Sequence, residues 1–326
     1  MDYGPRRKQF DQVLEEKQEC TIYDPIVQLL GMNLREEDIY CDIVLTVRAS
    51  FVDEIAEVEQ GGPGSQVLNE PLRERKGTSK EERHVMSEFQ EVSKQSGFHP
   101  KPAGLVLQYG TAGFRTNANQ LDHIMFRMGL LATLRSKTTK ATIGVMVTAS
   151  HNPEEDNGVK LVDPMGEMVS PTWEVYATQL ANAEQEDLLA ALKDIIEKEA
   201  LNMSQEAKVF VGKDTRGSSA RLSQAVLDGV SALGGHSKDY GLVTTPQLHY
   251  MVCCQNTQGK YGEATVEGYY NKLCQAFIKL SKNASNCTDD QKHLSVDGAN
   301  GIGALNARDG ESPEKGAAYI AVQRWQ

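Results

Sequence analysis

The chain has 326 residues, of which 40% are hydrophobic and 24% are charged, and this composition excludes a mostly disordered protein. Its 34 basic and 45 acidic residues give a net charge of −11, which argues against nucleic-acid binding through a broad basic face. Net charge still permits a small basic pocket for an anionic metabolite.

No apolar run approaches the ~20 residues that a membrane-spanning helix needs. The charged first residues, MDYGPRRKQF, lack the apolar segment of a secretory signal. The six cysteines form no CxxC pair, so we expect reduced thiols. These features predict a cytoplasmic protein that binds neither membranes nor nucleic acid, and they identify no protein partner.

The first 96 residues have no assigned role. Clustered β-branched residues predict one strand within residues 38–51. Residues 53–96 pass through a GGPG turn and the charged run RERKGTSKEER, with neither a helical nor a strand period. We expect disorder or a loose helix in this stretch.

From residue 97 onward, strands and helices alternate. Short strands are expected at 104–110, 142–150, 208–214 and 293–297. Helices are expected at 119–137, from 170 to about 200, and at 218–235. Residues 306–326 lose all periodicity. The alternation predicts an α/β layered fold with a largely parallel sheet.

A polar loop follows the most apolar of these strands. The segment VTASHNPEEDNGVK (147–160) places Ser150 at the carboxyl end of a parallel strand, where open α/β sheets bind their ligands. A serine there suits a covalent phosphoryl carrier, with His151 or Lys160 assisting proton transfer. The alternative is a polar turn in which Ser150 and Asn152 bond only their own backbone.

Two further loops contain arginines. In YGTAGFR (109–115), small residues let backbone N–H groups approach an anion, and Arg115 offers a fork to phosphate. The alternative is an ordinary loop with a surface arginine. In GKDTRGSS (212–219), Asp214 and Arg216 either pair only with each other or contribute to a site at a helix N-terminus.

These motifs, together with TTPQLHYMV and VDGANGIGAL, resemble the α-D-phosphohexomutase superfamily and, within it, the phosphoacetylglucosamine mutases. The resemblance is nearly continuous from about residue 98 to residue 305. The order of the motifs carries the narrower match. The serine loop precedes the GxDxR and TPxL segments here, whereas it follows them in most phosphohexomutases.

The resemblance implies a layered αβα first domain with a mixed, largely parallel sheet over residues 97–290. It implies the opening strand of a second domain over 291–305 and an unrelated tail over 306–326, while residues 1–96 match nothing in the family. The implied activity is that of an isomerase that interconverts N-acetylglucosamine 6-phosphate and N-acetylglucosamine 1-phosphate through a phosphoserine, for UDP-N-acetylglucosamine synthesis. The implied cofactors are one Mg²⁺ per site and a hexose 1,6-bisphosphate as primer or intermediate.

The resemblance also implies roles for individual residues. Ser150 is the phosphoserine and a Mg²⁺ ligand, and His151 and Lys160 are the neighbouring acid–base groups. Arg115, Asn152 and Arg216 bind the substrate.

The family's other motifs are an Asp-rich metal loop, a sugar-specificity loop and a loop that grips the substrate phosphate, and none occurs in this sequence. Each missing charge-stabilising donor typically lowers the rate by ~10²–10³-fold, so we expect the 326-residue chain to be inactive alone. The alternative function is non-catalytic: a truncated isoform, a mispredicted gene model or an interaction module. We also expect the strand at 294–297 to be unpaired, which is an aggregation risk.

Overall fold

The computed structural model describes residues 80–149, 152–281, 293–296, 301–303, 305 and 319–322. The strand expected within residues 38–51 lies outside the described residues, as do Ser150 and His151. In the part of the chain that is described, no helix combines the length and the apolar character needed to cross a membrane.

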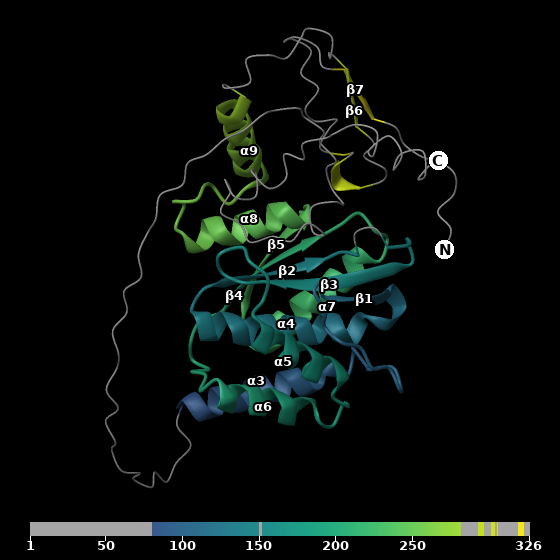
Figure 1. Cartoon of the computed structure of the whole chain (residues 1–326). Coiled ribbons are helices and arrows are strands. Elements are labelled where there is room, and N and C mark those ends of the chain that lie inside the picture. Colours follow the sequence, from purple (N-terminus) through teal and green to yellow (C-terminus); the bar gives the residue numbers. More distant parts are fainter. Residues whose placement is uncertain are drawn as a thin grey trace.

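A five-stranded sheet in the order β1–β3–β2–β4–β5 forms the centre of the fold (Figure 1). The strands are, in chain order, β1 Phe114–Asn117, β2 Thr142–Val147, β3 Asp156–Val162, β4 Lys208–Lys213 and β5 His236–Leu242. β4 runs parallel to β2 and β5, whereas β3 runs antiparallel to β1 and β2. The expected mixed α/β sheet is therefore confirmed, with antiparallel pairing on the β1 side.

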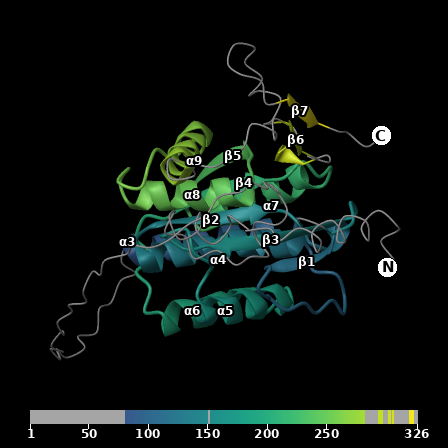
Figure 2. The same cartoon turned by 45° about the horizontal axis from the view of Figure 1, so that its top comes forward.

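Helices cover both faces of this sheet (Figure 2). One face carries α4 Asp122–Thr139 and α7 Ser219–Ala232, with α3 Lys80–Ser96, α5 Pro171–Asn182 and α6 Leu188–Lys198 beyond them. The other face carries α8 Thr245–Asn256, followed by α9 Val266–Ser281. A short 3₁₀ helix, Ala118–Gln120, leads from β1 into α4.

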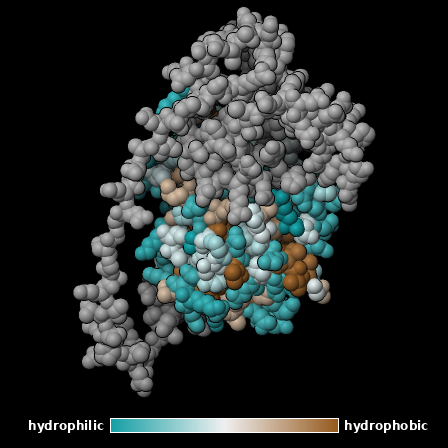
Figure 3. Space-filling view, in the orientation of Figure 1, coloured by the Kyte–Doolittle hydropathy of each residue, from teal (hydrophilic) through white to brown (hydrophobic). Residues whose placement is uncertain are grey.

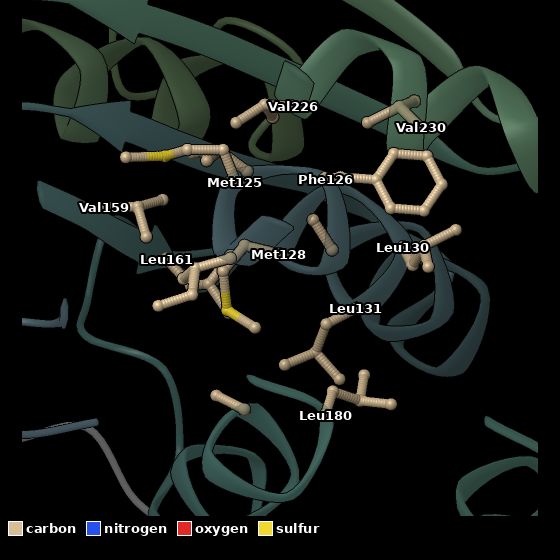
Figure 4. Packing of buried hydrophobic residues seen from close by; sticks show 14 of the residues in the cluster. Met125, Phe126, Met128, Leu130, Leu131, Val159, Leu161, Leu180, Val226 and Val230 are labelled. Carbon is tan, nitrogen blue, oxygen red and sulfur yellow. The ribbon is translucent and has the colours of Figure 1, made fainter. Parts of the chain in front are cut away.

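The alternation along β2 explains the two cores. Val145 and Val147 pack in the core with α4 and α7, whereas Met146 packs in a second core with Leu248 of α8. All six residues of β2 are buried, which is the pattern of a strand covered on both faces. Figure 4 shows α4 filling the space between the sheet, α5 and α7, with Met128 beside Leu161 and Leu131 beside Leu180.

The outer surface of the described residues is largely hydrophilic in the view of Figure 3, with small hydrophobic areas between polar ones. This agrees with the short set of exposed large hydrophobic residues, which includes Phe98, Val106 and Val175. The apolar surface of the domain is therefore mostly inside the two cores.

Residues 104–110, expected as a strand, do not join the sheet. The backbone N–H of Leu107 donates to Asn182 Oδ1 at 2.9 Å, and that of Tyr109 donates to Thr178 Oγ1 at 3.0 Å. Side chains of α5 thus satisfy backbone groups that a strand neighbour would otherwise satisfy. The edge strand forms four residues later, at β1.

Residues 80–96 form helix α3, in place of the disorder or loose helix expected there. Val92 is fully buried and belongs to the main core, and Phe89 packs against that core. Just after the helix, His99 Nδ1 lies 2.6 Å from Asp122 Oδ2, at the start of α4. The charged sequence hides this helix because only a narrow apolar stripe faces the protein.

The strand expected to be unpaired has a partner. β6, His293–Val296, pairs in parallel with β7, Tyr319–Val322, and Leu294 lies opposite Ile320. The expectation of an unpaired strand is therefore wrong, because the sequence YIAV within the aperiodic tail supplies β-forming residues.

Candidate active site

The polar loop emerges where three strands end. Beyond β2, the N–H of Thr148 donates to the carbonyl of Gly158 in β3 at 3.0 Å. Beyond β4, the N–H of Asp214 donates to the carbonyl of Val147 at 3.1 Å. These bonds bring Thr148, Gly158 and Asp214 close together in space, at the end of β2 where the serine loop begins.

The described flanks of Ser150 and His151 are close to each other. The N–H of Asn152 donates to the carbonyl of Ala149 at 3.0 Å. Asn152 Nδ2 donates to Asp156 Oδ2 at 3.1 Å, and the N–H of Asp156 donates to the carbonyl of Pro153 at 3.1 Å. Asn152, expected to bind substrate, thus stabilises the loop with its side chain.

Lys160 does not lie in the loop, because β3 already begins at Asp156. Within β3, Lys160 is buried and lies opposite Met146 of β2. The run Asp156–Asn157–Gly158 is typical of a turn, and this hid the strand from sequence reasoning. The strand returns the chain alongside β2 immediately after the loop.

Arg115 and Lys160 share one face of the sheet. Arg115 lies opposite Gly158, and Lys160 is two residues farther along the same strand as Gly158. Residues two apart on a strand, and residues directly opposed across a ladder, point to the same side. Two cations therefore lie on the face that bears Met146, in the strands that adjoin the serine loop.

One nitrogen of the Arg115 guanidinium has no hydrogen-bond acceptor among the described residues. This nitrogen is Nε, and it is buried. Gly158 opposite it permits close packing, because a Cβ there would lie 2.4 Å from the Phe114 carbonyl oxygen and 2.7 Å from that of Thr148. A cationic donor without an acceptor, beside a loop of polar residues, is suited to binding an anion.

Asp214 and Arg216, from the GKDTRGSS segment, both contact the loop region. Asp214 Oδ2 accepts from Thr148 Oγ1 at 2.8 Å and from Arg216 Nε at 3.2 Å. The guanidinium of Arg216 also donates to backbone carbonyls of the loop, at Asn152, Pro153 and Asp156. Asp214 and Arg216 therefore pair with each other, as one alternative predicted, and they also bond to the residues on both sides of the loop, which neither alternative predicted.

Sequence reasoning did not single out the buried polar groups that join the loop to α7. Asn157 Nδ2 donates to Ser218 Oγ at 2.8 Å and to Ser219 Oγ at 2.9 Å. Ser219 Oγ in turn donates to Asp214 Oδ1. The sequence contains a pair of serines at the start of this helix, a pattern that predicts an N-cap. The structure shows no capping hydrogen bond from the Ser218 side chain.

The described residues do not form a Mg²⁺ site by themselves. No group of three or more His, Cys, Asp or Glu side chains converges among them. The carboxylates of Asp156 and Asp214 already accept hydrogen bonds from neighbouring side chains. Mg²⁺ takes oxygen ligands in octahedral geometry, several of them often water, and Ser150, the ligand proposed from the resemblance, lies outside the described residues.

Comparison with known proteins identifies relatives of this domain. Residues 117–188 and 178–262 match the family described as phosphoglucomutase/phosphomannomutase, alpha/beta/alpha domain I. The chain is 66% identical over 220 residues to phosphoacetylglucosamine mutase of Homo sapiens, covering 68% of this chain and 41% of that protein. The chain spans about two fifths of the length of the curated relatives it matches.

Solved structures show the same fold. Aspergillus fumigatus N-acetylphosphoglucosamine mutase in complex with GlcNAc-6P and magnesium has a TM-score of 0.64 and 41% identity, over 73% of this chain and 44% of that one. A serine-to-alanine variant of the Aspergillus fumigatus enzyme, in complex with glucose 1,6-bisphosphate, has a TM-score of 0.66 and 40% identity, over 73% of this chain and 44% of that one.

Proposed function

We propose, on the premise that the chain carries domain I of the α-D-phosphohexomutase superfamily, that it supplies the phosphoserine loop of a phosphoacetylglucosamine mutase. The reaction is the interconversion of N-acetylglucosamine 6-phosphate and N-acetylglucosamine 1-phosphate. The observation that carries the proposal is the 66% identity to human phosphoacetylglucosamine mutase over 220 residues, which is 68% of this chain.

In this proposal Ser150 carries the phosphoryl group. A phosphorylated Ser150 gives its phosphoryl group to the free sugar hydroxyl, which forms a hexose 1,6-bisphosphate and leaves the serine hydroxyl. The other phosphoryl group of the bisphosphate then passes to the Ser150 oxygen: its bond to the sugar oxygen breaks, the serine proton passes to a neighbouring base, and the leaving sugar oxygen takes up a proton to become the free hydroxyl. The sugar phosphate is isomerised, and the serine ends as it began.

The remaining groups bind and transfer protons. Arg115, with its buried Nε lacking an acceptor, is proposed to contact a substrate phosphate. His151 or Lys160 is proposed as the acid–base group beside Ser150. Mg²⁺, with Ser150 as one ligand, and a hexose 1,6-bisphosphate are the proposed cofactors. Magnesium and glucose 1,6-bisphosphate occur in the complexes of the Aspergillus enzyme. We also propose that the protein acts in the cytoplasm, in the synthesis of UDP-N-acetylglucosamine.

A chimaera tests the proposal independently of the other domains of a mutase. Residues 98–305 would replace the matching part of human phosphoacetylglucosamine mutase, and conversion of N-acetylglucosamine 6-phosphate would be followed by NMR of the anomeric phosphate. We expect conversion within about tenfold of the human enzyme and its loss, by at least about 10³-fold, in the Ser150→Ala chimaera. A folded chimaera without conversion would contradict the proposal.

The 326-residue chain, assayed beside the chimaera, tests the non-catalytic alternative. We expect it to show no turnover, because the Asp-rich metal loop and the phosphate-gripping loop of the family do not occur in its sequence. Turnover close to that of the human enzyme would overturn this expectation.

A further inference from the structure

We propose that Asp214 and Arg216 are positioning residues that hold the two arms of the serine loop. In this role Arg216 influences phosphoryl transfer through the loop and does not contact the sugar phosphate. The expected effect on phosphoryl transfer rests on the proposed function. The hydrogen bonds that support the positioning role do not depend on that function.

Arg216 holds the arm that follows Ser150. Its Nη1 donates to the carbonyl of Pro153 at 2.6 Å and to that of Asp156 at 3.2 Å, and its Nη2 donates to the carbonyl of Asn152 at 2.9 Å. One guanidinium therefore gathers three carbonyls from five consecutive residues. The planar, forked arrangement of donors makes arginine suited to this, because a lysine ammonium cannot reach in three directions at once.

Asp214 holds the arm that precedes Ser150 and joins it to Arg216. Its Oδ2 accepts from Thr148 Oγ1 at 2.8 Å, two residues before Ser150. Its Oδ1 accepts from the N–H of Arg216 at 3.1 Å, and its Oδ2 accepts from Nε of the same residue at 3.2 Å. The side chains of Arg216 and Asp214 are only 11% and 16% exposed, so water competes little for these bonds.

The same bonds argue against direct substrate contact by Arg216. Each guanidinium nitrogen already has an acceptor within the protein. Turning the side chain toward a sugar phosphate would take this donor from three loop carbonyls, two of which accept from it in partly buried bonds. Arg115 differs, since its buried Nε lacks an acceptor among the described residues.

A positioning role has consequences for rate. A displacement of about 1 Å of a reacting group lowers the rate by roughly 10²-fold, because the attacking and transferred groups must be aligned. Loss of the Asp214–Arg216 clamp would free both arms of the loop at once. We therefore expect slower phosphoryl transfer with unchanged substrate affinity.

Hydrogen exchange on the 326-residue chain tests the clamp directly. We expect Arg216→Met to speed exchange of the amides at 152 and 154–157 by about tenfold or more, with the β2 and β4 amides unchanged. Arg135→Met is the matched control: Arg135 is similarly buried, at 15% exposed, and donates to both carboxylate oxygens of Asp163, outside the loop. The control is expected to leave loop exchange unchanged. Equal exchange of the loop in the Arg216→Met and unsubstituted chains would overturn the proposal.

Phosphoryl loading separates positioning from substrate binding. The chimaera that carries residues 98–305 within human phosphoacetylglucosamine mutase would be incubated with Mg²⁺ and glucose 1,6-bisphosphate, because the 326-residue chain is expected to be inactive alone. Phosphate on Ser150 would be followed by mass spectrometry. Positioning predicts a rate lower by about 10²-fold in Arg216→Met, partial recovery in Arg216→Lys, and an unchanged half-saturating concentration of the bisphosphate. A raised half-saturating concentration with an unchanged maximal rate would assign Arg216 to substrate contact and overturn the proposal. No loading of the unsubstituted chimaera would count against the proposed function, and the exchange result on the 326-residue chain would then decide the clamp.

Discussion

At the scale of single residues, burial changes the pKa of two basic side chains of α4, Arg127 and His123. Arg127 Nη1 donates to the carbonyls of Leu180, Ala181 and Ala183, which ties the end of α5 to α4. Burial lowers the pKa of Arg127 to about 10, so it stays charged at neutral pH. His123, on the same helix, is almost fully buried, and its Nδ1 has no partner among the described residues.

His123 makes stability depend on pH. Burial, followed by the nearby charges of Arg127 and Lys101, lowers the pKa of His123 to about 4 from its usual 6.5. As pH falls below 6.5, the unfolded chain takes up a proton that the folded chain refuses, so stability is lost between pH 6.5 and 4. We expect this residue to account for a loss of about 3 kcal/mol, measured by urea unfolding across that range. His123→Gln should flatten the profile, whereas replacing exposed His236 by Gln should not; identical profiles for all three proteins would contradict the assignment.

At the scale of elements, the contact between α4 and α7 sets how closely the helical layer packs. A Cβ on Gly129 would lie 2.2 Å from the Val226 carbonyl oxygen, and one on Gly229 would lie 2.0 Å from that of Phe126. Glycine at both positions therefore lets the two backbones touch. Sequence reasoning placed both helices but did not single out Gly129 or Gly229, because the need for glycine comes from the neighbouring helix.

Gly229→Ala is expected to force α4 and α7 apart. The obstacle is backbone and cannot rotate away, so the free energy of unfolding should fall by about 1–3 kcal/mol or more. Thermal and urea unfolding would measure the loss. Gly217→Ala is the control, because a Cβ there meets nothing within 4 Å. Equal stability of the two variants would show that the helices adjust to the added methyl.

At the scale of the whole molecule, helix α3 extends the helical layer toward the N-terminus. Val92 is buried in the main core, and His99, just after the helix, contacts Asp122 at 2.6 Å and Asp228 at 3.4 Å. The carboxyl pKa of Asp122 is lowered, chiefly by the hydrogen bond with His99. Residues 80–99 are therefore packed onto α4, α6 and α7.

A chain that begins at residue 97 is expected to be less stable than one that begins at residue 80. Removal of α3 exposes the apolar surface that Val92 and Phe89 cover, at about 25 cal/mol per Å². A lower unfolding midpoint and faster proteolysis of α7 would be measured in the shorter chain. Because both chains retain His99, the comparison isolates the helix. Equal midpoints would show that α3 adds nothing to the domain.

Much of the fold follows from local patterns in the sequence. The apolar run at 142–147, the Ser170–Pro171 helix start and the Gly234–Gly235 helix stop each specify an element through nearby residues. Such features need no distant contact, because hydrophobic period and capping chemistry act within a few residues.

Other features were decided only by tertiary contacts. Residues 104–110 carry a strand pattern, but the side chains of α5 take their hydrogen bonds. Residues 156–160 read as a loop, but pairing with β1 and β2 makes them a strand and places Lys160 inside the protein. Arg216 reads as a substrate ligand, but its guanidinium meets three carbonyls about 60 residues earlier in the chain. The sequence by itself determined most of the strands and helices that carry the predicted residues. Only the packed structure decided what the Arg216 guanidinium contacts, because its partners lie far away along the chain.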